Sequence, residues 1–134
     1  MNVFISYSHT DKKWADALRS GLTDAGFEVT VPGDDIEAGE NWHLEIGKAL
    51  DRANAMVVLL SPDSVASPNN RAEIEFALSS PHFRDRLIPL LVKPTADVPW
   101  ILRKQQFIRA TKNVGETVRR VVEALQHSPV AAGS

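Results

Sequence analysis

Residues 55–60 read Ala-Met-Val-Val-Leu-Leu, the longest uninterrupted apolar run of the chain. A strand is apolar at every position when both faces of its sheet are covered, as is usual for parallel sheets packed between helices. The run is far too short to cross a membrane as a helix. It therefore predicts the central strand of a parallel sheet.

The chain before this strand alternates between strand and helix patterns. Residues 3–6 and 27–31 are apolar segments rich in strand-forming side chains. Between them, apolar residues recur at helical spacing, with Thr10 or Asp11 as the expected N-cap. After a polar loop, a second helix is expected to begin near Trp42.

The chain after the central strand continues the alternation. Ser67 and Pro68 predict an N-cap and the first turn of a helix that runs to about residue 79. Residues 87–92 and 106–109 predict two further strands, although Pro89 is unusual inside a central strand, and a final helix follows. Strands that alternate with helices predict an α/β fold with a parallel sheet covered on both faces.

The composition fits one ordinary domain. The chain has 134 residues, 24% of them charged, and a formal net charge of −2, which argues against disorder and against a nucleic-acid partner. It has no cysteine, which excludes disulfides and cysteine nucleophiles. A strand follows Met1-Asn2 directly, so we expect no signal peptide, no membrane contact and a cytoplasmic location. We expect a domain at 1–127 and a linker-like tail at 128–134.

Several common kinds of site do not fit the sequence. The four histidines are scattered, so no metal site is expected. No Gly-x-Ser-x-Gly elbow, Rossmann glycine pattern or P-loop follows a strand. A phosphoacceptor receiver has the same alternating architecture and Asp63 lies near the end of the third strand, but the first strand lacks the acidic pair that would hold magnesium.

Polar side chains gather where the first three strands end. Ligands bind at this edge in open α/β sheets. It brings together residues 6–11, the loop after the second strand and the first turns of the helix at 68–79. On that helix Asn69 and Glu73 are four residues apart and share a face. Glu73 is then either a solvated helix carboxylate or a site residue beside the crevice.

Three ordered motifs carry a resemblance to a known family. Phe-Ile-Ser-Tyr-Ser at 4–8, followed by Asp11 and Trp14, resembles the first box of Toll/interleukin-1 receptor (TIR) domains. Residues 34–42 resemble their second box, and residues 56–62 with 71–78 resemble their third strand and the helix that carries the family's catalytic glutamate. The resemblance covers about residues 2–126 and is closer to bacterial TIR domains than to animal receptors.

The resemblance implies a flavodoxin-like three-layer fold with a five-stranded parallel sheet. For many bacterial members it also implies cleavage of NAD+ to nicotinamide and ADP-ribose or a cyclic ADP-ribose isomer, in signalling or antiphage defence. Glu73 falls on the catalytic position, and NAD+ is a substrate, so no cofactor or metal is expected. The substrate-binding residues are then expected to be Ser6, Tyr7, Ser8, Asp11, Asp34, Asp35 and Asn69.

The loop after the second strand has two interpretations. Its length and polarity suit a solvated connector. The resemblance implies instead that it docks on a second TIR domain during homotypic assembly and completes the pocket there, and a sensor or effector domain could follow residue 134. The residues expected to act in assembly are Pro32, Gly33, Ile36, Gly39 and Trp42, the last of which also fits the buried stripe of its helix.

Two other functions stay open at this point. One is a TIR interaction module that binds other TIR domains and catalyses nothing. Asn69 favours it, because many catalytic relatives have an aromatic residue there, as does Pro32, where many have an acid. The other is a nucleotide-binding sensor without turnover. Glu73 favours the enzyme.

Overall fold

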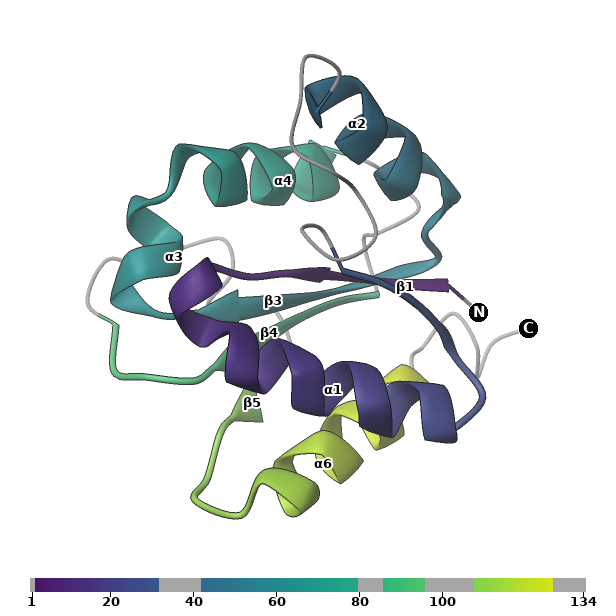
Figure 1. The fold of residues 1–134 in the computed structure, drawn as a ribbon, viewed down its shortest axis with the longest axis vertical. Coiled ribbons are helices and arrows are strands. Elements are labelled where there is room, and N and C mark those ends of the chain that lie inside the picture. Colours follow the sequence, from purple (N-terminus) through teal and green to yellow (C-terminus); the bar gives the residue numbers. More distant parts are fainter. Residues whose placement is uncertain (1, 32–41, 80–85, 96–107, 127–134) are drawn as a thin grey trace.

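The computed structural model describes residues 2–31, 42–79, 86–95 and 108–126 (Figure 1). The predictions for the loop at 32–41 lie outside these residues. In chain order the elements are β1 (Asn2–Ser6), a short 3₁₀ turn (His9–Asp11), α1 (Lys12–Asp24), β2 (Glu28–Thr30), α2 (Trp42–Arg52), β3 (Ala55–Leu60), α3 (Pro62–Ala66), α4 (Pro68–Ser79), β4 (Leu87–Leu91), β5 (Ile108–Arg109) and α6 (Val114–Gln126).

The strands form one five-stranded sheet in the order β2-β1-β3-β4-β5, and every pairing is parallel. This confirms the predicted α/β class and the flavodoxin-like sheet. β1 pairs with β2 on one side and with β3 on the other, where Ser6 lies opposite Val58. The strand order reverses between β1 and β3, so their carboxyl ends flank the switch point at which this architecture forms a ligand crevice.

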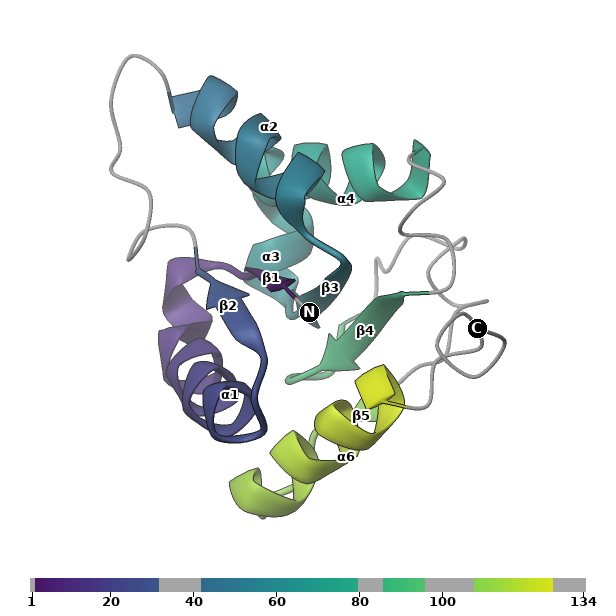
Figure 2. The same ribbon diagram turned by 90° about the vertical axis from the view of Figure 1, so that its right-hand side faces the viewer.

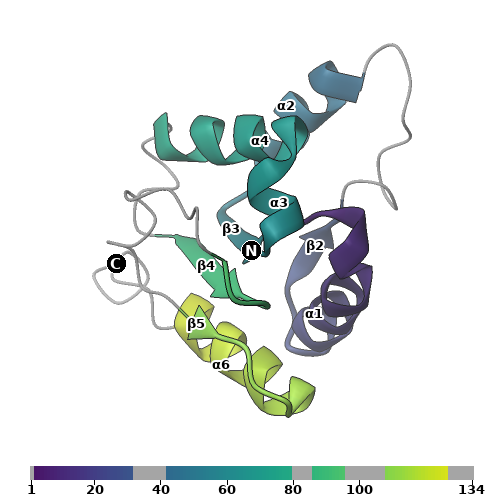
Figure 3. The ribbon, with the colours of Figure 1, turned by 90° about the vertical axis from the view of Figure 1, so that its left-hand side faces the viewer.

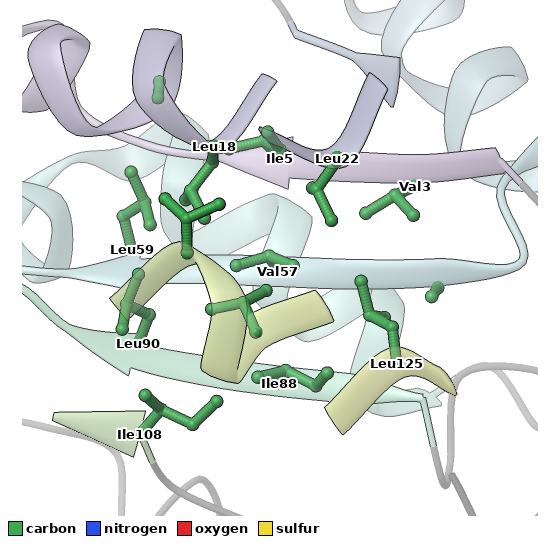
Figure 4. Close-up of a cluster of buried hydrophobic side chains, with 14 of the residues drawn as sticks. Val3, Ile5, Leu18, Leu22, Val57, Leu59, Ile88, Leu90, Ile108 and Leu125 are labelled. Carbon is green, nitrogen blue, oxygen red and sulfur yellow. The ribbon is translucent and has the colours of Figure 1, made fainter. Parts of the chain in front are cut away.

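Helices cover both faces of the sheet (Figures 2 and 3). α1 and α6 lie on one face, and α2, α3 and α4 lie on the other. Strand side chains alternate between the two layers, so Val57 belongs to the first core and Met56 and Val58 to the second. Figure 4 shows the first core, where Leu18 and Leu22 of α1 meet the sheet. β3 is buried at all of its positions, as its apolar run predicts.

Pro89 is tolerated in β4 because of how the neighbouring strands are placed. The backbone groups of Arg86 and Val92 bond to β3, whereas the carbonyl of Leu91 bonds to Ala110 after β5. The backbone N–H and C=O groups of successive residues in a strand point alternately to the two adjacent strands. The nitrogen of Pro89 therefore lies on the side of β5. β5 begins at Ile108, opposite Leu90. The described part of the ladder therefore needs no donor at Pro89.

One helix was not expected from the sequence. Residues 62–66 form α3, which begins directly after β3. The Ser61 hydroxyl accepts a hydrogen bond from the Ser64 nitrogen, and the Ser64 hydroxyl accepts one from the Ser61 nitrogen. Such a capping box satisfies two donors at a helix start. A capping box usually has Glu or Gln at its fourth position. Here that position is Ser64, so the motif was not recognised in the sequence.

A buried polar contact ties three strand ends together. Asp11 holds the N-cap position of α1, which is one of the two residues predicted from the sequence, although its side chain makes no capping hydrogen bond. Its Oδ2 accepts a hydrogen bond from Ser61 Oγ at 2.5 Å, and its Oδ1 lies 3.5 Å from Lys93 Nζ. The carboxylate thus links the segments that follow β1, β3 and β4, and fixes their positions at the carboxyl edge.

We expect Asp11→Ala to lower the free energy of unfolding by about 2 kcal/mol, because it removes a charged hydrogen bond and leaves buried Ser61 without its acceptor. Urea denaturation measures the change. Asp16→Ala is the matched control: Asp16 pairs with Lys12 at 3.3 Å on the exposed face of the same helix, and exposed pairs contribute little. Equal effects of the two substitutions would contradict the buried role of Asp11.

α1 and α6 approach closely at Gly21, where an added Cβ would lie 2.2 Å from Val118 Cγ1. Val118 is β-branched and has one dominant rotamer in a helix, so it cannot turn away. We expect Gly21→Ala to destabilise the fold by about 1–3 kcal/mol, and Val118→Ala to restore part of that loss in the double variant. Thermal denaturation of the four proteins measures this coupling.

Gly47→Ala is the control for Gly21→Ala, because a Cβ on Gly47 in α2 would meet nothing within 4 Å. Alanine is the better helix former, so this control should gain up to about 1 kcal/mol. Destabilisation by Gly47→Ala, or additive effects of Gly21→Ala and Val118→Ala, would contradict the proposed close contact.

Candidate functional site

The candidate site lies at the carboxyl edge of the sheet, beside the β1/β3 switch point. β1 and β3 both point to the end of the molecule where α1 begins and α3 lies (Figure 1). Ser6 is the last residue of β1 and is buried. α4 follows α3 and packs against β1, so its first turns lie at the same edge.

The start of α4 is fixed as the sequence predicts. Pro68 is its first residue, and the Ser67 hydroxyl accepts a hydrogen bond from the backbone nitrogen of Asn70 at 3.4 Å. This start sets which side chains face inward. Asn70 and Glu73 are buried, with 5% and 7% of their surface exposed, while Glu75 is exposed.

Glu73 is a buried carboxylate with only one of its two oxygens bonded. Its Oε1 accepts a hydrogen bond from Ser6 Oγ at 3.5 Å. Its Oε2 is buried and has no hydrogen-bond partner among the described residues. Burial raises the pKa of Glu73 from 4.5 to about 8, and the hydrogen bond from Ser6 opposes that rise only in part.

This environment excludes the interpretation of Glu73 as a solvated helix carboxylate. Water solvates the carboxylate of an ordinary surface glutamate. The carboxylate of Glu73 is buried and lacks this solvation, so its ionisation costs free energy. A ligand with a positive centre or a hydroxyl group would supply what its Oε2 lacks. Strongly shifted carboxyl groups in a crevice are typical of functional sites.

The other predicted site residues divide into three groups. Ser8 is buried, and its hydroxyl lies 3.2 Å from that of Thr10, which donates to Asp63 at 3.0 Å. Tyr7 packs against the first core, and Asp11 is held by Ser61 and Lys93. For the third group, the structure describes the backbone alone for Asn69 and Trp42, and Pro32, Gly33, Asp34, Asp35, Ile36 and Gly39 lie outside the described residues.

The structure thus brings Ser6 and Glu73 into contact and places Ser8 and Asp11 in the loop that follows β1. Their binding roles stay predictions, because no ligand contact tests them. The sequence analysis missed Asn70, whose buried Nδ2 has no partner among the described residues. Ser67 as N-cap fixes the helix phase, and the three-residue spacing from Asn70 to Glu73 was a usable signal.

The described residues contain neither a metal-binding cluster nor a membrane-spanning helix. No group of three histidine, aspartate or glutamate side chains in those ranges is placed to hold a metal ion. Among the helices that the structure describes, none combines the length and the apolarity needed to cross a membrane.

Solved structures with the same fold come from varied proteins. The TIR domain of the Toll-related receptor TRR-2 from Hydra magnipapillata is 24% identical, with a TM-score of 0.77 over 93% of this chain and 98% of that one. A prokaryotic SEFIR domain is 17% identical, with a TM-score of 0.74 over 96% and 94%. The Clostridium botulinum CMP N-glycosidase BcmB is 16% identical, with a TM-score of 0.65 over 92% and 99%.

These identities establish the fold alone. A comparison with curated protein sequences gives no significant match. The family itself is shown by sequence, since the family model described as "TIR domain" matches residues 3–125, nearly the whole chain. The ordered motifs, the parallel sheet and this match agree, and the chain belongs to the TIR domain family.

Proposed function

We propose that this TIR domain cleaves NAD+ at its nicotinamide–ribose bond, with Glu73 as the catalytic carboxylate. The observation that carries the proposal is the buried Oε2 of Glu73, which has no partner among the described residues and lies at the switch point of the sheet. The fold is compatible with chemistry of this class, since BcmB, described as a CMP N-glycosidase, shares it.

The reaction needs charge stabilisation more than proton transfer. The bond between ribose C1′ and the nicotinamide nitrogen breaks, and its electron pair goes to the nitrogen, so nicotinamide leaves as a neutral molecule without a general acid. Positive charge develops on the ribose, as in sugar hydrolysis. A carboxylate that faces this oxocarbenium ion lowers the barrier electrostatically. Neither a metal nor a further cofactor is required.

The second half of the reaction determines the product. Water attacks C1′ and releases a proton, which gives ADP-ribose. Attack by a nitrogen of the adenine in the same molecule would give a cyclic isomer instead. Glu73 serves both outcomes, because the cation that it stabilises is common to them.

Ser6 and Asp11 support Glu73 in different ways. Ser6 donates to Oε1 and so leaves Oε2 for the substrate. Asp11 anchors the residues after β1 to the start of α3 and to the segment after β4, and so fixes the loop that carries Tyr7 and Ser8. We propose that the ribose lies between this loop and α4.

The charge of Glu73 depends on what the site contains. With a pKa of about 8, Glu73 is largely neutral in the free protein at neutral pH. The cationic nicotinamide ring of NAD+ favours the carboxylate and lowers its pKa on binding. NAD+ therefore creates, through its own charge, the anion that its cleavage requires.

Assembly is the proposed means of activation. We propose that the domain associates with other TIR domains through residues 32–42, and that further domains, where present, bring copies together. Tethered TIR domains then associate although their intrinsic affinity for one another is weak, because tethering raises their effective concentration to the millimolar range. We propose that the domain acts in cytoplasmic signalling or antiphage defence.

The direct test is release of nicotinamide from NAD+ by the concentrated domain, free and displayed on a multivalent scaffold. We expect activity that rises on tethering and falls at least 100-fold in Glu73→Gln, since removing one charge-stabilising group typically costs that much. Glu75→Gln, two residues further on the same helix and exposed, is the matched control and should retain activity.

The alternative functions give different results in the same experiment. Self-association without nicotinamide release under every condition indicates an interaction module. Saturable NAD+ binding without products indicates a sensor. Equal activity of Glu73→Gln and wild type would assign the chemistry to another residue and end the proposal for Glu73.

The buried carboxyl group of Glu73 also predicts how the stability of the fold depends on pH. Between about pH 4.5 and 8 the unfolded chain has lost a proton that folded Glu73 keeps. The folded state then binds more protons, so the free energy of unfolding attributable to Glu73 falls as pH rises, by about 1.4 kcal/mol per pH unit. We expect Glu73→Gln to gain stability relative to wild type from pH 5 to pH 8.

Urea denaturation at each pH measures this difference, and Glu75→Gln should follow the wild-type curve. The effect needs no catalysis, so it tests the buried environment of Glu73 separately from the enzyme. Parallel curves for wild type and Glu73→Gln would mean that the carboxylate is solvated.

A further inference from the structure

A second buried polar group lies beside Glu73. Asn70 has 5% of its surface exposed, and its side-chain Nδ2 is buried with no hydrogen-bond partner among the described residues. Its backbone is fully engaged at the helix start, where its nitrogen donates to Ser67 Oγ. The helix therefore needs the residue's backbone, and nothing described in the structure needs its amide group.

Asn70 and Glu73 are one helical turn apart. Residues at this spacing are neighbours on a helix face, with Cβ atoms about 5–6 Å apart. The pair therefore offers a donor, Nδ2 of Asn70, next to an acceptor, Oε2 of Glu73, and both lack partners in the described structure. The two are complementary to a hydroxyl group, whose oxygen accepts from one and whose hydrogen is donated to the other.

Among the described residues, nothing accounts for the buried Nδ2 donor of Asn70. A buried donor without a partner destabilises a protein, whereas an apolar side chain of similar shape would not. Neighbouring Ile74 in α4 is buried in the second core, so an apolar residue at position 70 has packing partners on the same side of the sheet. A contact with a ligand would give this donor the partner that the described residues do not supply.

We propose that Asn70 is a substrate-binding residue that donates from Nδ2 to a ribose hydroxyl, while the same hydroxyl donates to Oε2 of Glu73. This inference rests on the proposed function and deepens it, because it assigns the substrate class: a ribosyl group with its hydroxyls intact. Sites that bond a hydroxyl discriminate strongly against analogues that lack it, since the protein groups are then left unpaired.

The test uses Asn70→Leu, which has a similar shape without the amide, with ADP-ribose as a probe that cannot react. ADP-ribose lacks the cationic ring, so binding is measured at pH 9, where Glu73 with its pKa of about 8 is ionised and its Oε2 can accept. We expect the melting temperature of the ligand-free variant to rise by about 3 °C, and its calorimetric affinity for ADP-ribose to fall at least tenfold. A residue with a purely structural role would lower the melting temperature when replaced. Glu75→Gln should leave both quantities unchanged.

Deoxy analogues show whether the contact is made with a hydroxyl. Two analogues of ADP-ribose, which lack the 2′- or the 3′-hydroxyl of the terminal ribose, should bind weakly. One of the two lacks the hydroxyl that Asn70 contacts. For that analogue, Asn70→Leu should cause no further loss of affinity, as a double-mutant cycle requires. An equal loss for all three ligands would overturn the hydroxyl contact. Unchanged ADP-ribose binding, a lowered melting temperature, or a wild type that does not bind ADP-ribose would overturn the inference.

The outcomes for catalysis and for Asn70 are separable. Asn70-dependent binding of ADP-ribose without NAD+ cleavage would refute the proposed enzyme and keep the ribose contact. NAD+ cleavage that persists in Asn70→Leu at wild-type kcat/KM would refute the contact and keep the enzyme.

Discussion

The parallel pairing of β1 with β3 is the constraint on which the rest of the structure depends. It places two strands that are distant in sequence side by side, with β2 beyond one and β4 beyond the other. Both strands are buried by helices from two sides, so their pairing forms the centre of both cores. The same pairing reverses the strand order, and Glu73 lies against Ser6 at this switch point, where open α/β sheets bind their ligands.

The site combines a set of residues that hold the strand ends in place, here called the frame, with polar side chains that lack hydrogen-bond partners among the described residues. Asp11, Ser61 and Lys93 tie the ends of three strands together. Glu73 and Asn70 lie beside this frame with one polar atom each left without a partner in the described structure. Buried polar groups of this kind lower stability and are kept where a ligand completes them. Asp11 and Glu73 are both buried acids at one edge, and each has one oxygen without a hydrogen bond among the described residues. The Oδ1 of Asp11 nevertheless lies 3.5 Å from the Lys93 ammonium, and this cation balances its charge.

Several features were predictable because they are local. The apolar run at 55–60 indicated a strand covered on both faces, and Ser67-Pro68 indicated where α4 begins. The motifs also indicated the family, which the match over residues 3–125 confirms. Other features could not be predicted, for a physical reason. Asp11 is the N-cap residue that the sequence indicated, but its carboxylate accepts a hydrogen bond from Ser61, fifty residues away. The α3 helix depends on a serine pair that imitates a longer capping motif.

The sequence by itself determined the alternation of strands and helices apart from α3, the family, and the identity of one acidic residue worth testing. These follow from periodicity, caps and motifs, which act over a few residues. Only the tertiary structure decided that Glu73 is buried against Ser6 and that Asp11 bonds to Ser61. It also decided that Asn70, one helical turn from Glu73, has a buried donor without a partner among the described residues. The burial of a side chain and its hydrogen-bond partners depend on which segments of the chain meet in space. The pKa of a carboxyl group is therefore shifted only when the fold buries the group away from water.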